Sequence, residues 1–279
     1  MNQVQRIPVF PTRYVPLRRD GGPIWLPAAD LAAPLALGAR GLVVGPSGSG
    51  RTTLLREIAH SITANADAIE LHVLLVDRSI DEHMEWRSEL AAAHIHGTTS
   101  EASPDEHSEL TTIFDEAATS AAQGRDIVLL VDSLAALARA LNASMELDER
   151  ILTGGIMATA LRALRECFGK ARAFEPDGSL TIIGTATADG DQELDTVVFE
   201  ELVGTGNIEY RLSADIAAAG LIPAIDIERS GTRGAERIVG DEEAERRARL
   251  RDLVSQYGRT AGLAMLLEHL DQHGQLPDA

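Results

Sequence analysis

The stretch Gly45–Thr52, with the sequence GPSGSGRT, is the feature that most constrains the fold of this chain. It follows the apolar run Gly41–Val44 and precedes an amphipathic run that begins at Thr53. A strand, a glycine-rich turn and a helix in this order form the setting of a phosphate-binding loop, because backbone N–H groups and the helix N-terminus surround the anion. The residues predicted to contact a bound nucleotide are Gly45, Pro46, Ser47, Gly48, Ser49, Gly50, Arg51, Thr52 and Thr53.

One position of this loop departs from the pattern G-x-x-x-x-G-K-[ST]. Arg51 stands where the pattern has the lysine that reaches the terminal phosphates. Arginine supplies nearly all the positive charge of the chain and Lys170 is its only lysine, so a bias in residue usage is one explanation. A planar guanidinium nevertheless does not replace a compact ammonium at a tight phosphate site. The loop therefore predicts nucleotide binding and leaves the chemistry of the site open.

Apolar runs alternate with helical stretches from Leu37 onward, which predicts an α/β fold with a mostly parallel central sheet flanked by helices. The runs predicted to be buried strands are Gly41–Val44, Leu71–Val76, Ile127–Val131 and Leu180–Thr185, with Ile208–Leu212 and Ala224–Ile227 as further candidates. The predicted helices are Thr53–Ala64, Asp81–Ala92, Pro104–Gln123 and Gly155–Ala173, and Ser103 is expected to cap the third of them.

Three segments are expected along the chain. Residues 1–36 are rich in Pro and Arg and are expected to form a connector, with a hairpin through Asp20–Gly22. Residues 37–240 form the nucleotide-binding core, and residues 241–279 form a C-terminal helical segment with helices at Glu242–Ser255 and Ala261–His273.

Charge and cysteine content narrow the class of protein. The net charge of −18 argues against a broad basic surface for nucleic acid, although it leaves room for a local basic channel. Cys167 is the only cysteine, so a disulfide framework is excluded and a buried apolar role is expected. We find no secretory or membrane-spanning run, which makes the cytoplasm the expected location.

Two acidic residues follow apolar strands and are candidates for metal or water binding. Asp132 ends the run Ile127–Val131, and together with Thr52 it is predicted to hold Mg²⁺, the alternative being that Asp132 caps the following helix. Asp77 ends an earlier run, and two interpretations are equally open for it: a carboxylate that polarises the attacking water, or a structural cap.

Other polar residues give weaker signals. Arg233, in the turn Ser230–Arg233, is a surface residue unless the protein assembles so that its guanidinium reaches the phosphates of a neighbour. The eight histidines are dispersed along the sequence, and no acid–histidine spacing matches a metal-binding helix. We therefore expect them to be surface or loop residues rather than a zinc site.

From Leu37 onward the sequence resembles the ATPase domain of bacterial transcription termination factor Rho. The segments that carry the resemblance are Arg40–Val44, Leu75–Asp77, Leu129–Ser133, Leu137–Ala140, Leu152–Gly155, Gly178–Ile183, Gly204–Asn207, Pro223–Asp226 and Arg229–Arg233. The resemblance implies a RecA-like P-loop NTPase core that uses ATP and Mg²⁺, assembles as a hexameric ring and translocates along RNA. It implies Mg²⁺ binding by Thr52 and Asp132, and an arginine-finger role for Arg233 across a subunit boundary. It also implies that Arg139 lies near the phosphates or the interface and that Ile222 replaces an aromatic residue beside the adenine.

The chain departs from the family at its functional positions. Arg51 replaces the P-loop lysine, and Arg78 stands at the position of the family's catalytic glutamate, where it is expected to be non-functional. Loss of such a carboxylate usually costs about two to four orders of magnitude in rate. The later channel loop, Asp189–Asp195, carries four acids, with Glu193 at or beside the position of the family's lysine, so it is expected to repel RNA phosphates. Only about 36 residues precede the core, so the family's N-terminal RNA-binding domain is expected to be absent.

Three functional hypotheses remain open from the sequence, and whether the chain is an enzyme is open among them. The first is a Rho-like ATP-binding pseudoenzyme with weak or no hydrolysis, which acts as a ring of its own copies or joins and modulates a true Rho ring. The alternative is an active RNA-dependent ATPase and translocase in transcription termination with altered catalytic residues. The third is a fold that has lost nucleotide binding.

Overall fold

The computed structural model describes residues 6–65, 68–146, 150–188, 192–222 and 224–277. The strands in chain order are β1 (Ile7–Val9), β2 (Tyr14–Val15), β3 (Leu35–Ala36), β4 (Arg40–Val44), β5 (Ile69–Leu75), β6 (His94–Gly97), β7 (Asp126–Asp132), β8 (Arg172–Glu175), β9 (Ser179–Ala186), β10 (Ile208–Arg211) and β11 (Gly231–Thr232). The helices are α1 (Leu26–Ala32), α2 (Arg51–Asn65), α3 (Ile80–Glu89), α4 (Pro104–Ala122), α5 (Leu134–Ser144), α6 (Ala158–Phe168), α7 (Glu193–Val203), α8 (Ala214–Ala218), α9 (Glu236–Val239), α10 (Asp241–Gln256) and α11 (Arg259–His273), with a 3-10 turn at Thr153–Gly155.

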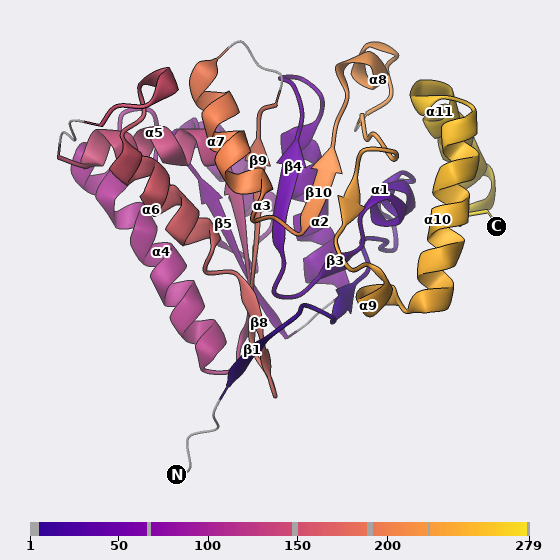
Figure 1. Ribbon diagram of the computed structural model, residues 1–279, viewed down its shortest axis with the longest axis horizontal. Helices are drawn as coiled ribbons and strands as arrows, with labels where there is room; N and C mark the ends of the chain where they lie inside the picture. The colour runs from indigo at the N-terminus through magenta and orange to yellow at the C-terminus, as the bar shows by residue number, and fades with distance from the viewer. Residues whose placement is uncertain (1–5, 66–67, 147–149, 189–191, 223, 278–279) are drawn as a thin grey trace.

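A mostly parallel sheet forms the centre of the molecule (Figure 1). Its strand order is β11-β10-β4-β9-β7-β5-β6, and β10 through β6 along this path run parallel. Antiparallel β11 closes one edge, and β8 carries β1 beside β9. The four main strands and the strand at Ile208 were predicted from their apolar runs, and the predicted α/β architecture is confirmed.

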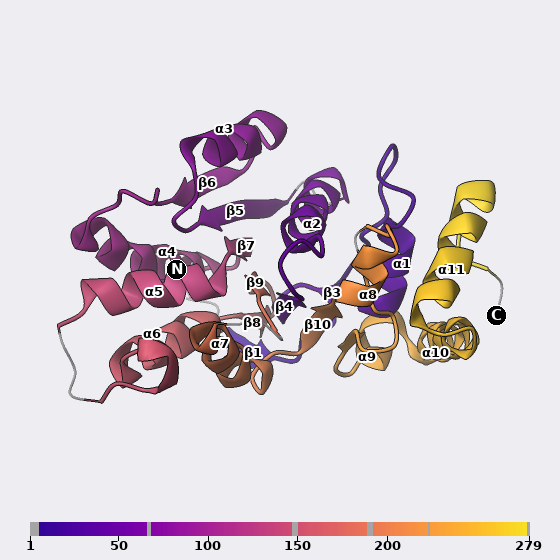
Figure 2. The same cartoon turned by 90° about the horizontal axis from the view of Figure 1, so that it is seen from above.

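Helices cover both faces of this sheet, as the view from above shows (Figure 2). Helices α2 and α3 pack on one face in the cluster that contains Val43, Ile58 and Trp86. Helices α4 to α7 pack on the other face in the cluster that contains Phe114 and Phe168. Because a parallel strand has buried residues on both faces, every residue from Ile127 to Asp132 of β7 is buried.

Local sequence explains where several helices begin. Ser103 and Glu106 form a capping box at the start of α4, which confirms the cap predicted there, and Ser79 with Glu82 does the same for α3. Ser133 caps α5 by accepting the N–H of Ala136. Asp132 therefore does not cap this helix, so the cap interpretation of that residue is wrong.

Other sequence predictions need correction. The helix predicted over Gly155–Ala173 begins only at Ala158, because Gly154 and Gly155 adopt positive φ angles of 77° and 76° that end the preceding turn. Ala224–Ile227 forms a single bridge between Leu212 and Ile225 instead of a strand. The turn at Asp20 and Gly21 leads to α1 rather than closing a hairpin.

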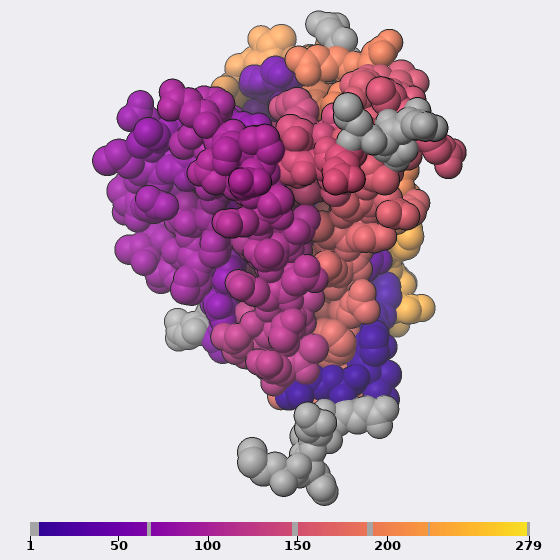
Figure 3. Space-filling view, turned by 90° about the vertical axis from the view of Figure 1, so that its left-hand side faces the viewer, coloured from indigo at the N-terminus to yellow at the C-terminus, as the bar shows by residue number. Residues whose placement is uncertain are grey.

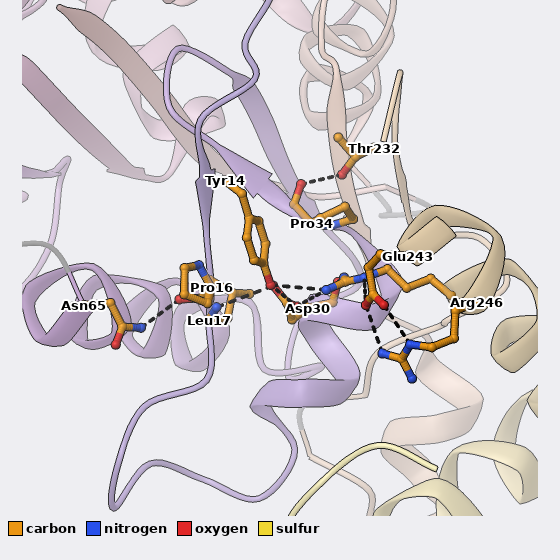
Figure 4. A network of polar contacts seen from close by, with 10 residues as sticks. Tyr14, Pro16, Leu17, Asp30, Pro34, Asn65, Thr232, Glu243 and Arg246 are labelled. Carbon is orange, nitrogen blue, oxygen red and sulfur yellow. Dashed lines mark hydrogen bonds and ion pairs between the residues drawn. The ribbon is translucent and has the colours of Figure 1, made fainter. Parts of the chain in front are cut away.

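The N-terminal segment packs against the C-terminal helices through a buried polar network (Figure 4). Asp30 of α1 accepts a hydrogen bond from Arg247 of α10 at 2.8 Å and one from the Tyr14 hydroxyl at 2.5 Å. Arg247 also donates to Glu243, whose second oxygen accepts from Arg246. The predicted helices α10 and α11 are present, and this network joins α10 to Tyr14 of β2 and to Asp30 of α1.

Candidate nucleotide-binding site

The loop between β4 and α2 has the shape that its glycines allow. Gly48 and Gly50 adopt positive φ angles of 78° and 96°, which side chains disfavour. A Cβ on Gly45 would lie 2.7 Å from Leu212 Cβ and from Ser49 Oγ, so only glycine fits there. The Ser49 hydroxyl donates to Pro46 O at 2.8 Å and closes the turn. The backbone thus curves around the N-terminus of α2, where an anion is favoured.

A cavity of about 250 Å³ lies beside this loop, where the carboxyl ends of β5, β7 and β9 meet. Ligands bind at this edge in open α/β sheets because the loops that follow parallel strands converge there. The lining residues are Ser47, Arg51, Thr52, Val76, Asp77, Arg78, Asp132, Ser133, Ala135, Ala136, Arg139, Thr185, Thr187, Gln192 and Asp195. The structure therefore brings together the predicted residues Ser47, Arg51, Thr52, Arg78, Asp132 and Arg139.

Asp132 is the centre of this site and is 2% exposed. Its Oδ2 accepts the hydroxyl of Thr52 at 2.7 Å, which is the contact that the sequence predicted for a Mg²⁺ site. Its Oδ1 accepts the hydroxyl of Thr185 and the Nη2 of Arg78, both at 2.7 Å. Both carboxylate oxygens are thus engaged, one of them by a cation.

The fit to a divalent metal ion is poor in this arrangement. Thr52 and Asp132 are the only predicted Mg²⁺ ligands, and the guanidinium of Arg78 lies on the carboxylate that would face the ion. Mg²⁺ binds through carboxylates and phosphates with near-octahedral oxygen ligands. A cation hydrogen-bonded to the one carboxylate competes with the metal for the same negative charge.

Arg51 faces the cavity from the first turn of α2. Its Nη1 donates to Thr187 Oγ1 at 2.6 Å. Burial lowers the pKa of its guanidinium, while Asp132 and Asp195 raise that pKa and Arg78 lowers it further. Because an arginine pKa starts far above neutrality, Arg51 stays charged and offers several N–H donors to a phosphate.

Arg139 and Asp195 close the cavity on the side of α5 and α7. Arg139 is 48% exposed along its side chain, and its Nη1 lies 3.8 Å from Asp195 Oδ1. Asp195 was assigned from the sequence to an acidic channel loop, together with residues 189–191, which lie outside the described residues. The structure places Asp195 in α7 and Glu193 at the first position of that helix, so Asp195 is a cavity residue.

Asp77 does not cap the following helix, so that interpretation is wrong, whereas its position at the cavity leaves the water-binding interpretation untested. Its Oδ1 accepts from Thr98 Oγ1 at 3.2 Å and lies 3.0 Å from His107 Nε2. The cap of the following helix is Ser79. A φ of 52° is uncommon for an aspartate and turns this residue at the point where β5 meets the cavity. One oxygen of its carboxylate is therefore held on the β6 and α4 side of the sheet, while the residue also lines the cavity.

Arg233, Ile222 and Thr53 do not line this cavity. Arg233 is exposed, and its N–H bonds Asn207 O at the amino end of β10. The P-loop follows the carboxyl end of the parallel neighbour β4, so Arg233 lies at the opposite end of the sheet. Ile222 is 56% exposed, two residues before Ala224, whose N–H bonds Ser49 O in the P-loop.

Among the lining residues that sequence reasoning did not assign to the site are Thr185, Thr187 and Asp195. Thr185 ends the predicted strand Leu180–Thr185 and Thr187 follows β9, the strand that lies between β4 and β7. Their position at the end of a predicted buried strand was a usable signal, because carboxyl ends of neighbouring parallel strands meet. Asp195 left no such signal.

The histidines were expected to be surface or loop residues, but three of them lie on neighbouring strands instead of in loops. His72 of β5 and the neighbouring His94 and His96 of β6 lie together with Glu70 at the edge of the sheet, away from the cavity.

A mostly parallel sheet with a glycine-rich loop and a polar cavity at its carboxyl edge defines a P-loop nucleotide-binding protein. The chain belongs to the ATP synthase alpha/beta family, because its residues 26–232 match the nucleotide-binding domain of that family. Membership of this family implies nucleotide binding.

Transcription termination factors Rho are similar to this chain, which confirms the resemblance found in the sequence. The Rho of Haemophilus influenzae is 38% identical over 241 residues, which cover 86% of this chain and 57% of the relative. The Rho of Bacillus subtilis is 38% identical over 249 residues, with 89% and 58% covered. That of Streptomyces lividans is 34% identical over 265 residues, with 95% and 38% covered. The chain therefore spans less than two thirds of the length of these relatives.

Solved structures share the fold at lower sequence identity. A prototypical ATPase from the type III secretion system of pathogenic bacteria superposes with a TM-score of 0.74 at 22% identity, over 95% of this chain and 80% of that chain. The assembled ATPase EscN from enteropathogenic E. coli gives 0.72 at 23% identity, over 94% and 61%. These matches support the RecA-like core. In the described part of the chain, no helix combines the length and apolar character needed to cross a bilayer.

Proposed function

We propose that this protein binds ATP in the cavity beside Gly45–Thr52 and hydrolyses it weakly or not at all. The family match, the loop geometry and the neighbouring polar cavity support the binding. In this proposal the loop amides and Arg51 hold the phosphates, while Ile222 lies beside the base. Such a protein acts by its nucleotide-dependent shape and contacts rather than by turnover.

The contact between Arg78 and Asp132 carries the proposal. Rho-like hydrolysis would need a carboxylate at position 78 to orient water, and a guanidinium accepts no proton. In this proposal Asp77 does not take over that role, because Thr98 and His107 hold its Oδ1 on the side of β6 and α4. Among the described residues that line the cavity, the remaining carboxylates are Asp132 and Asp195, each within 4 Å of an arginine. In this proposal none of these carboxylates acts as a general base.

The same substitution bears on the metal requirement. Replacing a glutamate by an arginine at position 78 removes one negative charge and adds one positive charge. The net change of +2 equals the charge of one divalent ion. We therefore propose that Arg78 neutralises the terminal phosphates and that ATP binding needs little Mg²⁺.

Assembly is the second part of this proposal. The guanidinium of Arg233 cannot reach the P-loop of its own chain, because the four residues of β10 span roughly 13 Å at about 3.3 Å per residue. An arginine at that end of the sheet suits contact with the nucleotide of a neighbouring copy, or with the site of a Rho subunit, in a ring. A cytoplasmic location and weak RNA binding accompany this proposal.

The test combines ATP binding with ATP turnover in the wild-type chain. We expect millimolar ATP to raise the melting temperature, because a ligand that binds only the folded state stabilises it. We expect turnover to stay far below about 1 s⁻¹, with or without RNA. Turnover above that rate would favour the alternative, an active RNA-dependent ATPase, and the absence of any ATP-induced shift would contradict the binding itself.

A further inference from the structure

Four metal-binding side chains gather on one face of the sheet edge, outside the nucleotide site. Glu70 and His72 stand two residues apart on β5, and His94 and His96 do so on β6. The parallel register pairs His72 with His94, and β6 is the edge strand of the described sheet. Because residues i and i+2 of a strand face the same side, all four side chains share one face.

The distances suit a small divalent cation. Glu70 Oε1 lies 2.9 Å from His72 Nε2 and 3.9 Å from His94 Nε2, and these three atoms all lie within 4.8 Å of one another. Ligand atoms about 2.0–2.1 Å from a tetrahedral zinc ion are about 3.3 Å apart, so small side-chain rotations bring these atoms to that spacing.

Outer contacts orient two of these ligands. His72 Nδ1 lies 2.9 Å from His96 Nε2, so in the tautomer with its proton on Nδ1 the ring can donate to His96, and Nε2, which otherwise donates to Glu70, offers its lone pair to a metal. The second oxygen of Glu70 accepts Arg125 Nη1 at 2.9 Å, which leaves Oε1 for the ion. Ligating histidines and carboxylates usually have such partners, and the partners fix both ring orientation and tautomer.

The location gives the ion a structural task. Strand β6 has four residues, pairs only with β5 and exposes both of its end residues, so little apolar burial holds it. In the space-filling view, the purple segment that contains α3 and β6 lies beside the magenta α4 (Figure 3). Thr98, directly after β6, accepts the backbone N–H of Arg78 at 3.1 Å. A tie between β5 and β6 therefore also fixes the segment that supports Arg78.

We propose that Glu70, His72 and His94 bind one zinc-class divalent ion that ties edge strand β6 to β5. Two imidazoles and one carboxylate favour zinc over Mg²⁺ or Ca²⁺, which prefer oxygen ligands alone. Water completes the coordination. The site is separate from the nucleotide cavity, since none of its ligands lines that cavity.

The test is a titration of the metal-stripped protein with ZnCl₂ in competition with a chromophoric chelator, with CoCl₂ absorption to report the geometry. We expect one ion per chain. His94→Ala is the informative variant, because this side chain is 58% exposed and its removal leaves the fold intact. We expect it to weaken zinc binding at least ~100-fold, and His96→Gln to weaken it about 10–100-fold through loss of the outer contact.

A matched control uses the second histidine pair of the described chain. His269 and His273 stack on exposed α11 with ring centroids 4.3 Å apart and offer a rival place for zinc. We expect His269→Ala to leave the wild-type affinity unchanged. If His94→Ala binds zinc as tightly as the wild type, or if the wild type binds none, the proposal is overturned and the four groups form only a hydrogen-bonded array.

Discussion

Two buried aspartates of this protein each accept an arginine, yet the two ion pairs have different surroundings. The side chains of Asp30 and Arg247 are 8% and 9% exposed, and the Tyr14 hydroxyl and the backbone carbonyl of Asp30 complete their hydrogen bonds (Figure 4). The side chain of Asp132 is 2% exposed, but that of Arg78 is 29% exposed and borders the cavity. The first pair is shielded from solvent, whereas the second borders the cavity that is proposed to bind ATP.

This difference separates an anchor from an exchangeable contact. Removing one partner of a closed pair leaves a charge with no route to water, which is strongly destabilising. An arginine at a cavity wall has solvent and ligand as alternative partners. Its contact with an aspartate therefore contributes little to folding stability and more to ligand specificity. Four predictions test this contrast.

The largest expected effect is on folding. Arg247→Ala leaves Asp30 buried without its cation, and we expect a loss of about 3–5 kcal/mol in the free energy of unfolding, measured by urea denaturation. The matched control is Arg249→Ala on the same helix, whose partner Glu245 is 3.9 Å away and whose side chain is 59% exposed. That change should stay within about 0.5 kcal/mol. Equal losses in the two variants would show that Asp30 gains nothing from Arg247.

The second effect is on turnover. Arg51→Lys/Arg78→Glu restores an ammonium and a carboxylate to a site whose Thr52–Asp132 contact is intact at 2.7 Å. We expect ATP hydrolysis in the presence of Mg²⁺ to rise by about two orders of magnitude or more over the wild type. Arg51→Lys alone is the control and should stay near the wild-type rate. An unchanged rate in the double variant would mean that more than these two residues suppresses hydrolysis.

The third effect concerns the metal dependence of ATP binding. In Arg78→Ala the guanidinium no longer neutralises phosphate, and we expect ATP affinity in EDTA to fall about tenfold, or about 1.4 kcal/mol. Added Mg²⁺ should restore much of this loss, since Asp132 is then free of its cation. Titration calorimetry with and without Mg²⁺ measures both steps, and Arg87→Ala at an exposed position of α3 is the control. A wild type that binds ATP only with Mg²⁺ would break the metal-sparing role of Arg78 and leave ATP binding itself intact.

The smallest effect is expected at Arg233. Since this residue lies at the opposite end of the sheet from the P-loop, Arg233→Ala should change the ATP affinity of the isolated chain by less than about twofold. The same titration measures it at a concentration where the chain is monomeric. A large loss there would place the guanidinium in its own site and remove the argument for a neighbour.

The sequence was enough to predict the core of both fold and site. Buried parallel strands are short apolar runs, and the residues that end them meet at one edge, so Thr52 and Asp132 lie together although 80 positions separate them, while their predicted binding of Mg²⁺ stays a prediction. The cap at Ser103 was recognised because helix capping is a local pattern, and the structure adds Glu106 as the second half of a capping box. In these cases the physics acts over a few residues or follows from the parallel arrangement of strands.

The remaining contacts depend on distances that no local pattern encodes. The His72–His94 pair follows from the register of β5 with the short β6, which the sequence did not predict as a strand. Arg78 was expected to be non-functional, and only the three-dimensional arrangement brings its guanidinium onto Asp132. Asp195 lines the cavity because it lies in the first turn of α7, which begins at Glu193, and not in the loop expected from the sequence.

The bond between Asp30 and Arg247 joins residues 217 positions apart, and this has a consequence for how the chain folds as it is made. At roughly 5–20 residues per second, translation delivers the arginine about 10–40 s after the aspartate. During that interval the carboxylate of Asp30 keeps its hydration, so α1, which carries Leu31, lacks the ion pair that holds its buried face against the rest of the protein. We expect the first part of the chain to remain open to chaperones until α10 leaves the ribosome, and folding of the outer layer to be among the last steps.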